Sequence, residues 1–195
     1  ITGGVGFAYE HLPQNSSVYR YRAGFSASRS HYDDDLAFNK FTPYVNISFK
    51  RKSLRDVGGR SLSARYVMVD KDIPEGIVNN ESYKYNILNF RYGFSEPEIV
   101  NDLRYFADFQ YNEGFSKASI DLRYRKLTNI NRYIDLRMYL GTFLFNNTSS
   151  DFFSFALDRP SDYLFDLNYL GRSESSGFLS QEIIITEGGF KSIFE

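Results

Sequence analysis

The sequence contains no cysteine, no tryptophan, two histidines and five prolines in 195 residues. Without cysteine the chain has no disulfide framework, no cysteine-ligated zinc site and no thiol nucleophile. The 23 Lys and Arg residues balance 24 Asp and Glu residues, so the basic excess of a nucleic-acid-binding domain is missing. The longest run free of charged residues, 138–150, is too short for a transmembrane helix. The compositional excess lies elsewhere, in 19 Phe and 16 Tyr.

The length of the chain fits one domain of ordinary size with enough residues to bury a core. No linker, low-complexity tract or composition shift interrupts the sequence. We therefore expect a single domain over residues 1–195, which is either a complete fold or a segment of a larger one.

Apolar and polar residues alternate with a period of two along most of the chain. In 102–112 five of the six even positions are polar or charged, whereas the odd positions are Leu103, Tyr105, Ala107, Phe109 and Tyr111. The segments 18–29, 40–50, 116–126 and 133–145 repeat this pattern. Because successive side chains of a strand point to opposite faces, the pattern predicts β-strands with one apolar and one polar face.

The alternating segments and the turn-like clusters between them predict an antiparallel meander of about 10–12 strands. Further strands are expected near 4–12, 61–69, 83–94, 152–158, 162–170 and 178–186. No segment of ten or more residues keeps an apolar stripe at helical spacing. The predicted fold class is therefore all-β.

Three features favour a transmembrane β-barrel over a soluble sheet, although the alternation alone fits both. Several segments alternate for 11–13 residues, and a tilted strand needs about 9–11 to cross a bilayer. Tyr and Phe are frequent on the apolar faces, as in an interfacial aromatic girdle, and reach the strand ends at Tyr19, Tyr111, Tyr124 and Phe145. The polar faces prefer Arg and Asp, whose short, fork-shaped pairs suit a crowded lumen.

A soluble all-β binding domain, with an aromatic surface for a ligand or partner, is the main alternative. The absence of Trp counts against a membrane girdle. The mean hydropathy of −0.41 does not separate the two hypotheses, because only alternate residues of a membrane strand face lipid.

The long Tyr- and Phe-rich strands, with Arg and Asp on the opposite face and short Asn- and Ser-rich turns, resemble those of outer-membrane β-barrels from Bacteroidota-type Gram-negative bacteria. The stretch 155–166 (Phe-Ala-Leu-Asp-Arg-Pro-Ser-Asp-Tyr-Leu-Phe-Asp), followed by 171–177 (Gly-Arg-Ser-Glu-Ser-Ser-Gly), is similar to the barrel segment of metallopeptidase-like proteins of that group. In those proteins a gluzincin domain precedes the barrel. The chain departs from the peptidase pattern, because neither His11 nor His31 lies in a His-Glu-x-x-His motif.

The resemblance implies a barrel without the enzyme, either by itself or as the membrane part of a longer metallopeptidase-like protein. The sequence shows no catalytic motif, and a metal site would need more ligands than two separated histidines. We therefore expect no enzymatic activity and no cofactor. The expected function is that of a membrane anchor, scaffold or subunit of an envelope complex in the bacterial outer membrane. Its expected partners are the lipid bilayer and other outer-membrane or periplasmic proteins, and not nucleic acid.

The membrane hypothesis predicts which side chains face lipid. The residues expected to point away from the barrel axis, and to be exposed when lipid is ignored, are Tyr105, Phe109, Leu122, Leu136 and Leu140. The residues expected to point inward and to be buried are Arg104, Asp121, Arg123, Asp135 and Arg137. A barrel of this size has a lumen largely filled by side chains, which disfavours a wide pore.

Matching the apolar faces also predicts the hairpin registers, because a one-residue slip turns every side chain over. A two-residue turn at 112–113 sets three pairs opposite each other: Asp102 and Arg123, Arg104 and Asp121, Asp108 and Lys117. Pairing Tyr124 with Ile134 in the next hairpin adds Arg123 opposite Asp135 and Asp121 opposite Arg137. We expect a lumen charge network of Asp102, Arg104, Asp108, Lys117, Asp121, Arg123, Asp135 and Arg137. A four-residue loop at 112–115 would also align the faces but would set Arg104 against Arg123.

Overall fold

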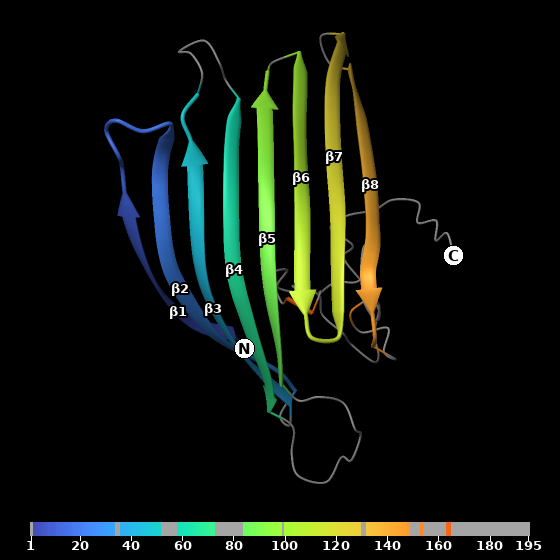
Figure 1. Ribbon diagram of the computed structural model, residues 1–195. Coiled ribbons are helices and arrows are strands. Elements are labelled where there is room, and N and C mark those ends of the chain that lie inside the picture. The colour runs from blue at the N-terminus through green and yellow to red at the C-terminus, as the bar shows by residue number, and fades with distance from the viewer. Residues whose placement is uncertain are drawn as a thin grey trace. The chain divides into compact units, whose positions relative to one another are not determined.

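Eight antiparallel strands form one sheet, and each strand pairs with its neighbours in the sequence (Figure 1). The strands of this computed structural model are β1 (Thr2–His11), β2 (Val18–Asp33), β3 (Leu36–Phe49), β4 (Gly59–Asp72), β5 (Lys84–Pro97), β6 (Asn101–Asn112), β7 (Phe115–Asn129) and β8 (Arg132–Asn146). The structure describes residues 2–33, 36–51, 58–72, 84–98, 100–129, 132–148, 153 and 163–164, with the backbone alone for 2, 30–33, 36, 71 and 72.

Contacts within the chain separate two units, Ile1–Asn147, which holds the whole sheet, and Thr148–Glu195. Few residues of the second unit are described. Among them, the rings of Phe153 and Tyr163 meet edge to face with their centroids 5.4 Å apart, and Leu164 is buried. The expectation of a single domain over 1–195 stays a prediction.

The structure confirms the predicted all-β antiparallel meander, and a strand covers each of the eight segments expected between residues 4 and 145. The strands expected at 152–158, 162–170 and 178–186 lie outside the described residues, except for Phe153, Tyr163 and Leu164. Phe153 has 3-10 conformation and Tyr163 and Leu164 lie in a turn, so the strand prediction is wrong for these three residues. The segments 155–166 and 171–177, which carry the metallopeptidase-like resemblance, are likewise outside the described residues apart from 163–164.

Within the described strands, β1 and β8 each pair with one neighbour, so the sheet is open along these two edges. The predicted closure into a barrel is not observed in this sheet. The part of the chain that the structure describes contains no helix with the length and apolar character needed to cross a membrane.

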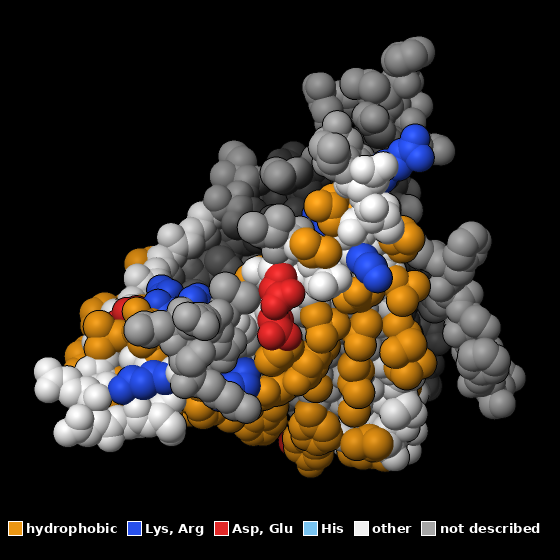
Figure 2. Space-filling model, turned by 90° about the horizontal axis from the view of Figure 1, so that it is seen from above, with side chains coloured by type: hydrophobic (Ala, Val, Ile, Leu, Met, Phe, Trp, Pro, Cys, Tyr) orange, Lys and Arg blue, Asp and Glu red, His pale blue; other side chains and the backbone are white. Residues whose placement is uncertain are grey.

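The sheet separates an apolar face from a polar face, because the register keeps like positions together across all seven pairings. On the apolar face, the alternate residues of eight segments are all apolar or Tyr: 5–9, 21–27, 41–47, 62–68, 88–94, 103–111, 118–124 and 134–140. We call these residues the apolar band. Figure 2, which looks along the strands, shows hydrophobic side chains gathered on one side over β5 to β8.

The apolar band is exposed. Val5 and Phe7 on β1 are 70% and 63% exposed, and Leu136 and Leu140 on β8 are 59% and 60% exposed, as predicted. Tyr105, Phe109 and Leu122 lie on the same face but are half-buried, because neighbouring rings cover part of it. The Tyr105 ring, for example, stacks on Phe94 with the centroids 4.9 Å apart.

The polar face is only partly enclosed. The side chains of Asp121 and Arg137 are 15% and 25% exposed, whereas those of Arg104, Arg123 and Asp135 are 49%, 44% and 49% exposed. None of the five residues is buried, so the prediction that they are buried is wrong for this sheet, most clearly for the last three. Its open edges leave the polar face accessible.

Two aromatic side chains on the polar face lie close to glycines of the adjacent strand. Tyr44 is paired with Gly24, and a Cβ added to Gly24 would lie 3.1 Å from the Tyr44 hydroxyl. Phe106 is paired with Gly93, where an added Cβ would lie 3.3 Å from the Phe106 ring. An aromatic side chain that covers a glycine shields the glycine backbone from water, which reduces the destabilisation that glycine causes in a strand. It also helps to fix the pairing of the strands.

Turn chemistry explains why the predicted β6–β7 register is wrong by two residues. The two-residue turn is 113–114, with Asn112 paired to Phe115, and not 112–113. The Asn112 side-chain oxygen accepts a 2.9 Å hydrogen bond from the Gly114 N–H. An Asn side chain that accepts a hydrogen bond from the backbone N–H two residues further on stabilises this type of turn. Gly114 is therefore the second residue of the turn and not the first residue of β7.

A bulge sets the β7–β8 register. Asn129 is paired with Arg132 at the turn, and the register shifts by one residue between Leu127 and Asn129. Without this shift, polar positions of β7 would oppose apolar positions of β8. Tyr124 is consequently paired with Leu136, and the predicted pairing of Tyr124 with Ile134 is wrong.

Candidate functional site

Charged side chains concentrate on the polar face of β4 to β8. Ten of them, six arginines and four aspartates, form what we call the charge network: Arg65, Arg91, Asp102, Arg104, Asp108, Asp121, Arg123, Arg125, Asp135 and Arg137. All lie at alternate positions of their strands. The period-two pattern is therefore what brings them to one face.

Asp108 on β6 is the acceptor of one cluster. The Arg91 Nε on β5, directly opposite, lies 2.9 Å from one carboxylate oxygen and 3.0 Å from the other. The Asn89 amide donates to Asp108 at 3.0 Å, and the Asn89 oxygen accepts from the Arg65 Nε at 2.7 Å. Asn89 is 1% exposed. A chain of polar bonds thus crosses β4, β5 and β6.

Asp121 on β7 is the acceptor of a second cluster. Arg137 on β8 bonds both of its oxygens, at 3.1 and 2.7 Å, and Arg123 on the same strand as Asp121 adds bonds of 3.4 and 3.1 Å. Asp121 is directly opposite Tyr139, so the Arg137 bond runs diagonally between the strands. A half-shielded carboxylate between two guanidiniums is a strong, charge-assisted arrangement.

Two further pairs lie toward the end of the sheet that carries the β7–β8 turn. Arg104 bonds Asp102, two residues away on β6, with Nη2 to Oδ2 at 2.6 Å. Arg125 and Asp135 are directly opposite, with Nε to Oδ1 at 2.7 Å. The Arg125 guanidinium also lies over the Tyr133 ring, 4.7 Å from its centroid.

Lys117, expected to face Asp108, is instead paired with Gln110 and is 4% exposed. Its ammonium lies 5.6 Å from the ring centroids of both Phe115 and Phe143. A cation that is shielded from water gains from the quadrupoles of aromatic rings. Lys117 therefore lies in an aromatic surrounding.

The structure therefore brings together the predicted Asp121 and Arg137, although diagonally, and changes the other predicted pairs. Asp102 opposes Arg125, Asp108 opposes Ser119, and Arg104 opposes Arg123. Asp135 is bonded by Arg125 and not by Arg123 as predicted.

Sequence reasoning missed Arg65, Asn89, Arg91 and Arg125. The first three lie at odd positions of β4 and β5, on the face of Val67 and Ile87. Because they occupy alternate positions, these three residues lie on the same face of the sheet. They are joined to Asp108 through the register of β5 and β6. No turn rule predicts this register from the sequence of residues 98–100, which connect the two strands.

The carboxylates of the network are the more shielded partners. The Asp108, Asp121 and Asp102 side chains are 13%, 15% and 20% exposed, and each is bonded to at least one guanidinium. The geometry suits charge pairing that holds side chains in place, and it offers no activated nucleophile among the described residues.

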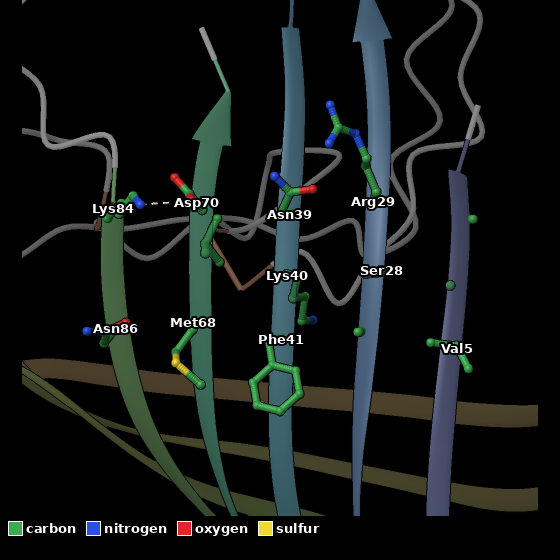
Figure 3. Close-up of a pocket in the computed structure, with 14 residues that line it drawn as sticks. Val5, Ser28, Arg29, Asn39, Lys40, Phe41, Met68, Asp70, Lys84 and Asn86 are labelled. Carbon is green, nitrogen blue, oxygen red and sulfur yellow. Dashed lines mark ion pairs between the residues drawn. The ribbon is translucent and has the colours of Figure 1, made fainter.

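Two hollows open on the apolar face. One, of about 580 Å³, lies where Ala107 and Ala118 leave space between larger neighbours such as Phe109 and Leu140. The other, of about 570 Å³, spans β1 to β5 and is shown in Figure 3. In this second hollow Val5, Phe41 and Met68 lie at one level, and Arg29, Asn39 and the ion pair of Lys84 with Asp70 (3.1 Å) lie at the next.

Among the described residues, no group of three or more His, Asp or Glu side chains is placed to hold a metal ion. No protein-family model, no curated protein and no solved structure matches this chain.

Proposed function

We propose that this chain is the membrane-spanning part of an outer-membrane β-barrel that serves as an anchor, scaffold or subunit of an envelope complex. The support comes from the apolar band, none of whose residues is buried, on one face of a sheet of 10- to 16-residue strands. A soluble sheet buries its apolar face against a second layer. A membrane barrel exposes that face to lipid.

The observation that carries the proposal is the oblique course of the apolar band across the hydrogen-bonded rows. The row through Leu136, in the middle of the band on β8, continues to Tyr124 and Leu103 and reaches Glu96, outside the band on β5. The row through Ala64 on β4 leaves the band at Thr142 on β8. The band is therefore inclined to the rows.

The centre of the band moves in one direction across the sheet, although it does not move at the β2–β3 and β3–β4 pairings. Arg65, at the centre of 62–68, is paired with Asn89, whereas 88–94 is centred two residues further on, at Arg91. Over the seven pairings the band moves by seven residues, and it never reverses. With about 3.3 Å per residue and 4.8 Å between strands, this corresponds to a strand tilt of roughly 35°. Strands of membrane barrels tilt by about 35–45°, so a band of constant height would follow this course.

The edge of the band is sharp, as expected where hydrocarbon gives way to water. The row Val5, Ala27, Phe41, Met68 ends the band on β1 to β4. The next row along the same strands is Gly3, Arg29, Asn39, Asp70 (Figure 3). One step of two residues thus exchanges an apolar row for a polar one.

On this proposal the charge network faces the lumen. Its polar bonds link β4, β5 and β6 through Asn89 and Asp108, and they link β7 and β8 through Asp121 and Asp135. The proposed role is to fix the lumen side of the sheet, which suits an anchor or scaffold better than a wide pore.

One observation favours a soluble all-β domain instead. Val67, Ile87 and Phe115, on the polar face, are fully buried, and Val69 is 2% exposed. Buried hydrophobic residues on that face are what a core would show. Against this stand the large hydrophobic side chains of the opposite face, whose exposure would make a soluble protein prone to association.

The solvent requirement of the protein separates the two proposals. The purified full chain is transferred to plain buffer and to detergent micelles, and each sample is followed by analytical ultracentrifugation and far-ultraviolet circular dichroism. The membrane proposal predicts a folded, monodisperse β-protein in detergent and aggregation in plain buffer. A monomer that stays folded in plain buffer and unfolds cooperatively on heating would establish the soluble domain.

A further inference from the structure

Strands β3 and β4 separate at the end of the sheet where β3 ends and β4 begins. Their pairing stops at Ser48 and Ser61. Beyond this point the β3 side stays with β2, since Val18 is paired with Phe49 and the Lys50 N–H bonds the Ser17 carbonyl at 2.9 Å. The β4 side stays with β5, through Arg60 with Phe94 and Gly59 with Ser95. We call this opening the fork.

The fork holds the largest of the three hollows described for the protein, about 870 Å³. Its described lining includes three cations, Lys50, Arg51 and Arg60, and four aromatic residues, Tyr19, Phe49, Phe94 and Phe106. None of the described lining residues is acidic. The Lys50 ammonium donates to the Gln14 carbonyl at 3.1 Å.

The two guanidiniums at the fork differ from those of the charge network. Each aspartate of the network is bonded to an arginine, whereas neither Arg51 nor Arg60 forms an ion pair with a residue that the structure describes. Arg60 is nevertheless half-buried. A cation held at a cavity without a carboxylate partner is suited to an anion supplied from outside.

The fork lies at one edge of the apolar band. Ile47 and Leu62 form the last row of the band on β3 and β4, and the fork opens directly beyond them. An anion at Arg60 would therefore lie where the lipid-facing surface ends. The ligand that combines an anion at this level with apolar chains below it is a membrane lipid.

We propose that the fork binds the phosphate group of an anionic phospholipid, with the guanidiniums of Arg51 and Arg60 as the main donors. Arg binds phosphate through two parallel N–H hydrogen bonds. The aromatic residues of the fork would contact the acyl-chain segments nearest the headgroup. This proposal rests on the proposed membrane function.

The absence of Trp makes the test direct, because a single introduced Trp is the only indole in the protein. The full chain carrying Phe94→Trp is reconstituted in vesicles of phosphatidylcholine and phosphatidylglycerol, with bromine on the chains of one lipid at a time. A second reporter, Leu136→Trp, lies in the middle of the band on β8. Bromine quenches an indole that its chain touches.

We expect both brominated lipids to quench Leu136→Trp equally at equal mole fraction, and brominated phosphatidylglycerol to quench Phe94→Trp more strongly. In the Phe94→Trp background, Arg51→Gln with Arg60→Gln should lower the preference for phosphatidylglycerol roughly fivefold for each cation removed. The matched control is Lys126→Gln with Arg132→Gln, which removes two exposed cations from the same end of the sheet outside the fork. It should leave the preference unchanged.

The outcomes separate this site from the membrane function. If Leu136→Trp is quenched and Phe94→Trp shows no preference, the fork site is wrong and the membrane function stands. If neither brominated lipid quenches Leu136→Trp, both the fork site and the membrane function are wrong. If the control variant loses the preference equally, or added inorganic phosphate abolishes it, the site is not one for lipid phosphate. Quenching of Leu136→Trp in the Arg51→Gln and Arg60→Gln background shows that the variant is still embedded.

Discussion

Arg104 and Arg123 lie directly opposite each other on β6 and β7, and each bonds an aspartate two residues away on its own strand. Two like charges at opposed positions would repel each other. Asp102 and Asp121 relieve this repulsion, with Nη2 to Oδ2 distances of 2.6 and 3.1 Å. Charge pairing on this face therefore runs along the strands and diagonally as well as straight across them.

The first prediction concerns this register. The chain has no cysteine, so a pair of introduced cysteines can form only one disulfide. Arg104→Cys with Arg123→Cys should cross-link readily under mild oxidation, because directly opposed residues have Cβ atoms about 4.5–5.5 Å apart. Asp102→Cys with Arg123→Cys, a diagonal pair, should cross-link far less. The yield of each disulfide is measured after proteolysis as the fraction of the sample whose fragments stay linked and migrate more slowly on a gel. A higher yield for the pair of residues 102 and 123 would instead support the register with the turn at 112–113.

The second prediction concerns the coupling within the charge network. A double-mutant cycle of Asp121→Asn and Arg137→Gln should give a coupling energy of about 1–3 kcal/mol, since the pair is bidentate and shielded. The free energy of unfolding is measured by urea titration in detergent. The cycle of Arg125→Gln and Asp135→Asn serves for comparison and should give a smaller coupling, because both side chains are exposed. Equal couplings would mean that burial does not strengthen the network.

The third prediction separates three glycines by what an added methyl group would meet. Gly93→Ala should destabilise the protein by about 1–3 kcal/mol, because the Cβ would lie 2.9 Å from the Ser61 hydroxyl and 3.3 Å from the Phe106 ring. Gly24→Ala should cost more, since the Phe7 carbonyl oxygen, a backbone atom, blocks the Cβ. Gly3→Ala, with nothing within 4 Å, is the neutral control. Urea titration in detergent ranks the three, and a Gly24 variant as stable as the Gly3 variant would contradict the observed β1–β2 pairing.

The fourth prediction concerns depth in the membrane. Leu136→Arg should lower the free energy of unfolding in a bilayer by about 2–4 kcal/mol, as expected for a cation on the lipid face near the midplane. Val100→Arg, at a similarly exposed residue between β5 and β6 (51% against 59% for Leu136), should change it by no more than about 0.5 kcal/mol. Folding into vesicles is followed over a urea series. Similar effects of the two substitutions would argue that Leu136 does not lie in hydrocarbon.

Period-two alternation was sufficient to predict the strands and their faces, because the side-chain period of a strand does not depend on its partner. It was not sufficient for the registers. The choice between turns 112–113 and 113–114 depended on one hydrogen bond, from the Gly114 N–H to the Asn112 side chain. That choice moved every ion pair of the hairpin by two residues.

Other features of the site depend on three-dimensional packing that alternation does not encode. Lys117 has the sequence pattern of a network member, yet it lies between the rings of Phe115 and Phe143. The ring of Phe143 comes from β8 and reaches Lys117 only through the bulge in this pairing. Arg65 and Asn89 join the network through the β4–β5 pairing, whose register alternation alone does not specify.

The central claim, that the apolar face of this sheet lies against lipid, is tested most directly by a scan of single Trp substitutions at residues 134–141 of β8. The chain without Trp is the blank. In vesicles with bromine on the lipid chains, we predict strong quenching at Ile134, Leu136, Met138 and Leu140 and weak quenching at Asp135, Arg137, Tyr139 and Gly141. Quenching that shows no period of two, or that is strong at the second set, would contradict the claim.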